Sequence, residues 1–163
     1  MRAWLRVLVL ALVACGDATP ERAPGAVGPE PIADHAGAVC GMLVRDQSAP
    51  RGQVRHRDGE RAHLCSIGDL LAYLEAPSPH GRPEDVWVEV MDPEEDPWDV
   101  HPEAHPWVLA QDAIYVVGVR RRQIMGPPVL VYRDRPSAER VAGSEGRVLA
   151  YPELVAWWQQ RDR

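Results

Sequence analysis

Residues 53–74 read QVRHRDGERAHLCSIGDLLAYL, and this stretch contains the unit on which the predicted fold is built. Two short segments, 53–57 and 61–65, flank an Asp58-Gly59 pair of the kind that closes a β-hairpin. Ser66 follows, with an acidic residue three positions later, a pattern that favours the start of a helix. The stripe of leucines after it predicts a helix that ends near Ala76.

The order strand, strand, helix recurs further along the chain. Strand character is predicted by apolar or alternating residues in four segments, 86–91, 114–119, 129–133 and 148–151. Pro136 stands where the first turn of a second helix would begin, and residues 152–160 predict a third helix. We therefore expect an α+β domain in which two related ββα halves pack on each other.

The composition limits the classes of function. The 163 residues suffice for one compact domain, and the net charge of −6 argues against a nucleic-acid binder, which needs a basic surface. The chain contains no lysine and no asparagine, which excludes a catalytic lysine, a P-loop and an N-linked glycan. Nucleophile-elbow serines, glycine-rich phosphate loops and His-Glu-x-x-His helices are also missing from the sequence, so we do not expect an enzyme.

The first fifteen residues have the form of a bacterial lipoprotein signal. Two arginines precede the apolar run 7–14, which is too short to span a bilayer, and residues 12–15, LVAC, resemble a lipobox whose cysteine becomes the lipidated first residue. The expected organisation is a signal peptide over 1–14, a lipid anchor at Cys15 with a flexible linker over 15–37, and a folded domain over 38–163. Cleavage would leave 16 arginines against 24 acidic residues, a net charge of −8, and two cysteines in an oxidising compartment.

A cysteine and a methionine stand two positions apart in VCGMLV, residues 39–44, which predicts a strand. On an extended chain Cys40 and Met42 point to the same side, and the glycine between them lets the backbone approach closely. A thiolate and a thioether are soft donors that favour Cu(I) over Zn(II). Met125, beside a glycine and two prolines, offers a further thioether. The alternative for all three is ordinary packing, with a buried cysteine and methionines that fill gaps.

His63 and Cys65 lie two positions apart, on one face of the strand predicted over 61–65. Cys65 could supply a third sulfur to a metal, pair with Cys40 in a disulfide, or stay a buried thiol, and the residues leave these three alternatives open. His63 is a further candidate metal ligand beside it.

Residues 84–106 hold nine acidic residues together with His101 and His105. A solvated acidic loop is the simplest interpretation. The alternative is a loop that collects a divalent metal or docks a partner, because a His-x-x-x-His pair among carboxylates can hold a borderline ion. Neighbouring prolines disfavour the helix that would align the two rings.

Together these residues resemble the NosL family, the lipoprotein accessory factors of nitrous oxide reductase. The resemblance covers nearly the whole predicted domain and rests on segments in the family's order: the lipobox, Cys40-Gly41-Met42, Arg57-Asp58-Gly59, CSIGDL at 65–70, WVLAQDAIYV at 107–116 and Met125-Gly126. The chain departs from the family at Ile124, where proline is usual, and in an acidic insertion at 94–105.

The resemblance implies a fold of paired ββα modules, similar to a domain of organomercurial lyase. It also implies a Cu(I)-binding protein, lipid-anchored and facing the periplasm, that delivers copper for assembly of the copper centres of nitrous oxide reductase. By position, Cys40 and Met42 match the family's Cys-x-Met element, and Met125 matches the methionine of its Pro-Met-Gly turn. The implied partners are the membrane and apo-nitrous oxide reductase, or another copper donor or acceptor protein.

Two other functions stay open on the residues alone. One is a non-catalytic envelope lipoprotein in which Cys40 and Cys65 form a structural disulfide and the methionines only pack. The other is a general copper-handling protein of the cell envelope. Chemistry on organometals would rest on the likeness of fold alone.

Overall fold

The computed structural model describes residues 28–122 and 126–161. The predicted signal peptide, the lipidation site Cys15 and the candidate ligand Met125 lie outside the described residues. Within those residues, no helix is both long and apolar enough to cross a membrane.

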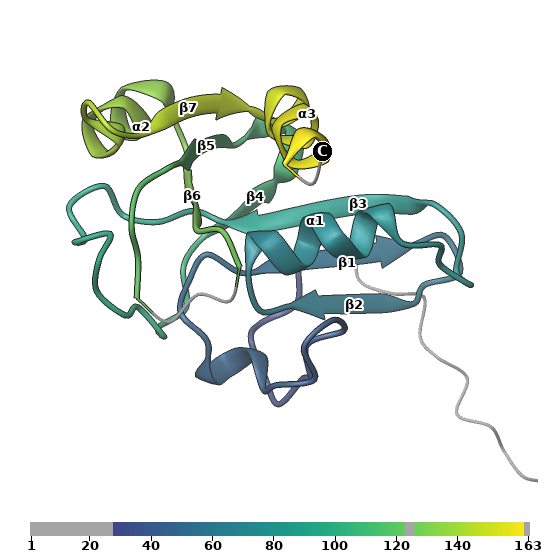
Figure 1. The fold of residues 1–163 in the computed structure, drawn as a ribbon. Coiled ribbons are helices and arrows are strands. Elements are labelled where there is room, and N and C mark those ends of the chain that lie inside the picture. The colour runs from purple at the N-terminus through teal and green to yellow at the C-terminus, as the bar shows by residue number, and fades with distance from the viewer. Residues whose placement is uncertain (1–27, 123–125, 162–163) are drawn as a thin grey trace, which may run out of the picture.

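Four antiparallel strands form the larger sheet, in the order β2-β1-β3-β4. The hairpin of β1 (Gly52–His56) and β2 (Arg61–Leu64) leads into helix α1 (Ile67–Glu75). Strand β3 (Pro83–Glu89) then returns beside β1, and β4 (Trp107–Leu109) adds an edge. Helix α1 lies across one face of this sheet (Figure 1).

A smaller sheet repeats the same arrangement. Strand β5 (Ile114–Val117) pairs with β6 (Val129–Tyr132), helix α2 (Arg135–Ala142) follows, and β7 (Arg147–Ala150) pairs with the other side of β5. Helix α3 (Tyr151–Gln160) ends the fold. The α+β class and the paired ββα halves are thus confirmed. Each half adds a strand after its helix, so both contain a ββαβ unit in which the first strand lies between the other two, and the larger sheet also carries β4 at its edge.

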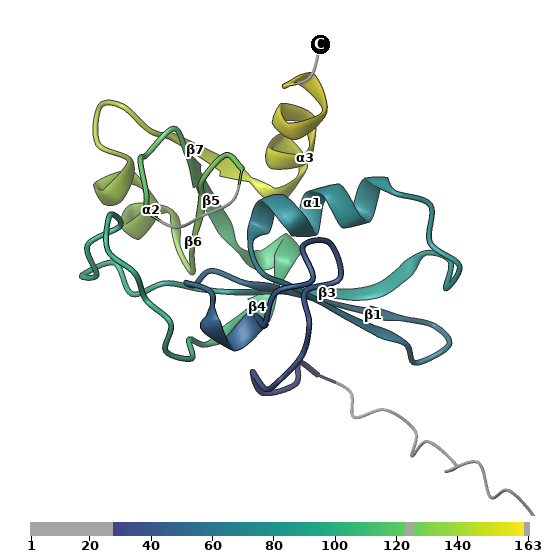
Figure 2. The same cartoon turned by 60° about the horizontal axis from the view of Figure 1, so that its bottom comes forward.

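The main core lies between the two units. Along β5 the side chains alternate, so that Tyr115 and Val117 join the core shared with α1 and α3, whereas Val116 packs in a second cluster with α2. Helices α1 and α3 lie close together on this side (Figure 2), where the Trp158 indole donates a hydrogen bond to Glu75 at 3.0 Å. Packing between the units therefore buries one face of each sheet.

Helices α1 and α2 begin with matching caps. The Ser66 hydroxyl accepts a hydrogen bond from the Asp69 amide at 3.0 Å, as the sequence predicts. At α2 the Asp134 carboxylate accepts from the Ser137 amide at 2.8 Å. The first unit thus has serine at the cap and aspartate three positions later, whereas the second unit has aspartate at the cap and serine three positions later.

The strand predicted over residues 39–44 is wrong. The chain turns here instead, because Gly41 takes a φ of +71°, in the left-handed region that glycine tolerates. The short 3-10 helix Val44–Asp46 follows the turn. Strand β3 also begins three residues earlier than predicted, and the short strand β4 was not predicted.

A buried ion pair joins the start of β1 to the end of β3. The Arg51 and Glu89 side chains are inaccessible to solvent, and the guanidinium donates to both carboxylate oxygens, at 2.5 and 3.0 Å. Its other hydrogen bonds reach the carbonyls of Gln47, Pro102 and Glu103. The pair therefore ties residues 92–106, hereafter the acidic loop, to the larger sheet.

Replacing Arg51 with methionine is expected to lower the free energy of unfolding by about 3–5 kcal/mol, because a buried carboxylate is left without its counter-charge. Urea unfolding followed by circular dichroism measures this change. The matched control is Arg140→Met, which removes an exposed partner of Glu94 and should cost less than about 1 kcal/mol.

A second substitution separates lost charge pairing from lost volume. Adding Glu89→Leu to Arg51→Met is expected to recover much of the lost stability, because no unpaired charge is then buried. An Arg51→Met variant as stable as Arg140→Met would contradict this role of the pair.

Candidate metal centre

Cys40 lies in a tight turn that two backbone hydrogen bonds close. The Gly37 amide donates to the Met42 carbonyl at 2.7 Å, and the Gly41 amide donates to the Gly37 carbonyl at 2.8 Å. The Ala38 amide donates to the His63 carbonyl at 2.8 Å, which joins the turn to β2. The backbone therefore holds Cys40 against the end of β2, where Cys65 follows.

The thiols of Cys40 and Cys65 lie next to each other. The Cys40 thiol donates to the Cys65 sulfur at 2.9 Å, and both cysteines are free. Cys65 is buried, and its thiol makes a weak hydrogen bond to the Met42 carbonyl at 3.7 Å. Cys40 is only half-buried, so it forms the solvent-facing member of the pair.

Asp69, in the first turn of α1, completes a cluster with the two thiols. One oxygen of its carboxylate and the two sulfurs all lie within 4.8 Å of one another. Burial raises the pKa of the Cys65 thiol, and the neighbouring Cys40 and Asp69 raise it further. Burial also raises the pKa of Asp69, although the Cys40 thiol partly opposes that rise. These surroundings thus favour the neutral form of the Cys65 thiol.

Gly37 leaves space beside the two sulfurs. A Cβ atom at this position would lie 2.5 Å from the Cys65 sulfur and 2.8 Å from the Cys40 sulfur, which is closer than real Cβ atoms approach. Any side chain here would push into the thiol pair. Glycine is therefore required if the sulfurs are to keep this arrangement.

The other candidate ligands occupy different surroundings. Met42 is half-buried and contributes its carbonyl to the turn, but it does not lie on the extended chain that the sequence predicts. Met125 lies outside the described residues. His63 belongs to a separate cluster, although only one residue separates it from Cys65.

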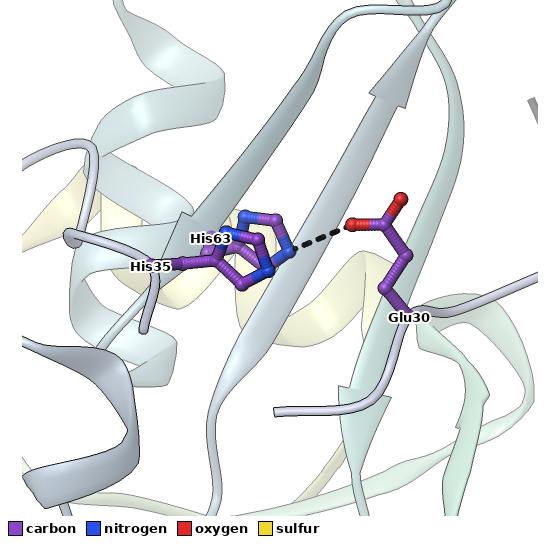
Figure 3. Close-up of side chains that lie close together, drawn as sticks. All are labelled: Glu30, His35 and His63. Atoms are coloured by element: carbon purple, nitrogen blue, oxygen red, sulfur yellow. Dashed lines mark ion pairs between the residues drawn. The ribbon is translucent and has the colours of Figure 1, made fainter. Parts of the chain in front are cut away.

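This second cluster contains Glu30, His35 and His63 (Figure 3). The two imidazole rings stack with centroids 3.8 Å apart and planes 2° from parallel. Nε2 of His63 lies 3.4 Å from a Glu30 carboxylate oxygen, yet no hydrogen bond satisfies this nitrogen among the described residues. Burial lowers the pKa of His63, and the neighbouring His35 lowers it further. His63 is therefore neutral at neutral pH.

A third cluster lies in the acidic loop, where Glu95, His101 and Glu103 approach one another. Both nitrogens of His101 already have partners, in the Glu103 carboxylate and the Asp96 carbonyl. His105 likewise contacts the Glu103 carbonyl and the Glu95 carboxylate. These contacts give His101 and His105 a structural role, because they join parts of the acidic loop to one another.

Three cluster residues were not candidates on sequence grounds. Asp69 appeared only as part of a helix cap, although its place one turn after Cys65 could have indicated it. Glu30 and His35 fall within the predicted linker, yet their segment packs against the domain: the Glu30 backbone exchanges two hydrogen bonds with the Gln53 side chain. No local pattern indicates either residue, because Glu30 is held by the distant Gln53 side chain and His35 by the Val44 amide.

Comparison with known proteins places the chain in a family. The NosL family matches residues 30–156. The chain is 31% identical over 161 residues to the copper-binding lipoprotein NosL of Achromobacter cycloclastes, a match that covers 95% of this chain and 82% of that protein. It is 30% identical over 129 residues to the copper-binding lipoprotein NosL of Stutzerimonas stutzeri, covering 77% of this chain and 66% of that protein, just under two thirds.

The fold also has a solved counterpart. The crystal structure of the copper chaperone NosL from Shewanella denitrificans aligns with a TM-score of 0.65 at 24% identity, covering 77% of this chain and 94% of that one. The names of the two curated relatives describe copper-binding lipoproteins, in agreement with the expectation that the chain is not an enzyme. The chain belongs to the NosL family.

Proposed function

We propose that the chain is a lipid-anchored Cu(I)-binding protein that faces the periplasm and delivers copper for assembly of the copper centres of nitrous oxide reductase. The observation that carries the copper part is the pair of free thiols 2.9 Å apart at the end of β2. The names of the relatives, which describe copper-binding lipoproteins and a copper chaperone, support it.

The donor atoms favour Cu(I) over harder ions. Cys40 and Cys65 offer two thiolates, and Met42 and Met125 are the proposed thioether donors that complete a soft, low-coordinate site. The Asp69 oxygen is a hard donor, which Cu(I) prefers less than sulfur. Its role in the proposal is to take the proton from a neighbouring thiol that binds copper and to pass it on to the solvent, since one of its oxygens lies within 4.8 Å of both sulfurs.

The two cysteines differ in exposure to solvent, so they have different roles in the proposed transfer of copper. Buried Cys65 retains the ion, whereas half-buried Cys40 is open to the ligand of an incoming acceptor. A sulfur of the acceptor can therefore replace one donor at a time, so that copper moves without becoming free. Cys15 carries the proposed lipid anchor, and the segment after it connects the domain to the membrane.

The neighbouring thiols also support one alternative function. The same contact between sulfurs would allow a Cys40–Cys65 disulfide in an oxidising compartment, and the chain would then be a structural envelope lipoprotein. Titration of free thiols in the isolated protein separates the two functions, because copper binding requires reduced cysteines.

The reduced chain is expected to bind one Cu(I) ion. Cys40→Ser should abolish binding, because it removes the accessible thiolate, and Met42→Leu or Met125→Leu should weaken affinity by about tenfold through loss of one thioether, about 1.4 kcal/mol. Competition with a chromophoric Cu(I) chelator measures each affinity.

Met91→Leu is the matched control for the methionine variants. Met91 is buried in the cluster beneath α2, and leucine conserves its volume, so Cu(I) affinity should not change. If Cys40→Ser bound Cu(I) as tightly as the parent, the thiol pair would not be the copper site.

The apparent affinity for Cu(I) is expected to rise with pH by about tenfold per pH unit for every thiol proton displaced. The raised pKa of Cys65 keeps this thiol protonated through the neutral range, so copper must displace its proton there. Between about pH 6 and 8 the slope for the parent should therefore exceed that for Cys65→Ser. Competition titrations across this range provide the measurement, and equal slopes would exclude Cys65 as a thiolate ligand.

Delivery is tested in cells that make nitrous oxide reductase but lack their own NosL protein. The parent chain should fractionate with membranes and restore the copper content of the reductase. Cys15→Ser should move the chain out of the membrane fraction, and Cys40→Ser should leave it there while copper delivery is lost. Full copper content with Cys40→Ser would argue against delivery through this site.

A further inference from the structure

We propose that Cys40 and Cys65 form a redox-active pair, closed as a disulfide in an oxidising compartment and reopened by a protein dithiol that attacks the Cys40 sulfur. The class of reaction that must precede copper loading is then a thiol–disulfide exchange. The exchange itself stands on the geometry of the two sulfurs. Its place before copper loading rests on the function proposed above, because the same sulfurs are the proposed copper ligands.

The backbone holds the two sulfurs within reach of a covalent bond. They lie 2.9 Å apart, and a disulfide of about 2.05 Å requires them to approach by only about 0.9 Å. Cys65 directly precedes Ser66, which caps helix α1. The turn of Cys40 is fixed to β2 by the Ala38 amide, which donates to the His63 carbonyl at 2.8 Å. The bond therefore forms through small side-chain movements, with both elements in place.

Only one sulfur of the closed pair is open to a protein reductant. Cys40 is half-buried, whereas Cys65 is 5% exposed. A thiolate attacks a disulfide sulfur in line with the S–S bond, from the side opposite the sulfur that leaves. An attack on Cys40 comes from the solvent side, whereas an attack on Cys65 would have to come from the buried side. Cys40 is therefore the attacked sulfur, and Cys65 is the leaving one.

The exchange balances in two steps. The thiolate of the reductant forms a bond to the Cys40 sulfur, the Cys40–Cys65 bond breaks, and its electron pair goes to the Cys65 sulfur, which takes a proton from water. The second thiol of the reductant then loses its proton to water and attacks the mixed disulfide, which releases Cys40 and leaves the reductant as a disulfide. Two electrons have moved from the reductant to the chain, and both sulfurs can then bind copper.

The surface around Cys40 suits such a partner. Val39 and Leu43, in the same turn, are 48% and 38% exposed. Among the residues that the structure describes, the other exposed large apolar side chains are Trp98 and Val100 of the acidic loop. Exposed apolar residues beside a reactive sulfur favour a partner whose attacking thiol is surrounded by an apolar face. The partner class is therefore a protein dithiol rather than a small soluble thiol.

Oxidation and copper loading exclude each other. A closed disulfide leaves no thiolate for Cu(I), so the oxidised chain lacks both of its proposed cysteine ligands. The pair differs from a purely structural disulfide, because its accessible sulfur lets a mild dithiol open it while the chain stays folded. Reduction of the pair is thus the step that makes the chain able to receive copper.

The first experiment uses the full chain with Cys15→Ser, so that Cys40 and Cys65 are its only cysteines. Oxidised glutathione should close the pair. The closed chain is then mixed with a thioredoxin whose second active-site cysteine is replaced by serine, which attacks a disulfide but cannot resolve the adduct. A mixed disulfide should accumulate, and peptide mass spectrometry should find it at Cys40. The Cys65→Ser chain, isolated with Cys40 as a free thiol, has no disulfide to attack and should give no adduct.

Reduction rates with intact thioredoxin test the apolar surface. Val39→Asp and Leu43→Asp should each slow this reduction about fivefold or more, because they place a charge in the contact. Reduction by dithiothreitol, which needs no apolar surface, should keep its rate. Val100→Asp is the matched control, since it makes the same exchange at an exposed valine of the acidic loop and should leave both rates unchanged.

Copper titration distinguishes failure of this proposal from failure of the copper function. The reduced chain should bind one Cu(I) and the oxidised chain none, in competition with a chromophoric chelator. Thiols that stay free in excess oxidised glutathione, an adduct at Cys65, or thioredoxin rates that both surface variants leave unchanged would overturn the proposal. An oxidised chain that binds Cu(I) as tightly as the reduced one would overturn the order of steps. A pair that opens and closes as expected while the reduced chain binds no Cu(I) would contradict the copper function alone.

Discussion

The buried ion pair between Arg51 and Glu89 is the constraint on which the other loops depend. Both charges have left water, so they stay paired only while β1 and β3 keep their register. The same guanidinium donates hydrogen bonds to carbonyls in the segment after the Cys40 turn and in the acidic loop. One cation thus connects two loops that are about fifty residues apart in the chain. The acidic loop and the segment that follows the Cys40 turn are therefore held to the same point of the larger sheet.

Soft and borderline donors are separated although they share strand β2. Cys65 continues the strand toward α1 and meets Cys40, whereas His63 faces the segment that enters the domain. Each cluster joins one residue near β2 to a residue of the preceding loop. The two clusters therefore differ in chemistry and not only in place, because one offers sulfur donors and the other offers imidazole and carboxylate donors.

Local signals predicted most of the fold. The Asp58-Gly59 hairpin and the Ser66 cap act within a few residues, so sequence alone indicates them. The Cys40 turn was missed because its short apolar run, VCGMLV, resembles a strand, while the reversal depends on one glycine with positive φ. The sequence left open whether Cys65 shares a metal with Cys40, pairs with it in a disulfide or stays a buried thiol, since strand periodicity does not say which distant loop packs at the strand end. Glu30 was missed because its position depends on Gln53, a distant side chain.

The two ββαβ units share their architecture but not the residues of the thiol cluster. In the second unit the position of Cys65, directly before the helix cap, is taken by the exposed Arg133, and Ser137 replaces Asp69. Both copies nevertheless form the same strands, helix and cap. The residues that specify the architecture are therefore not those that bind ligands. Ligand sets can diverge between copies of this template while the scaffold is inherited intact.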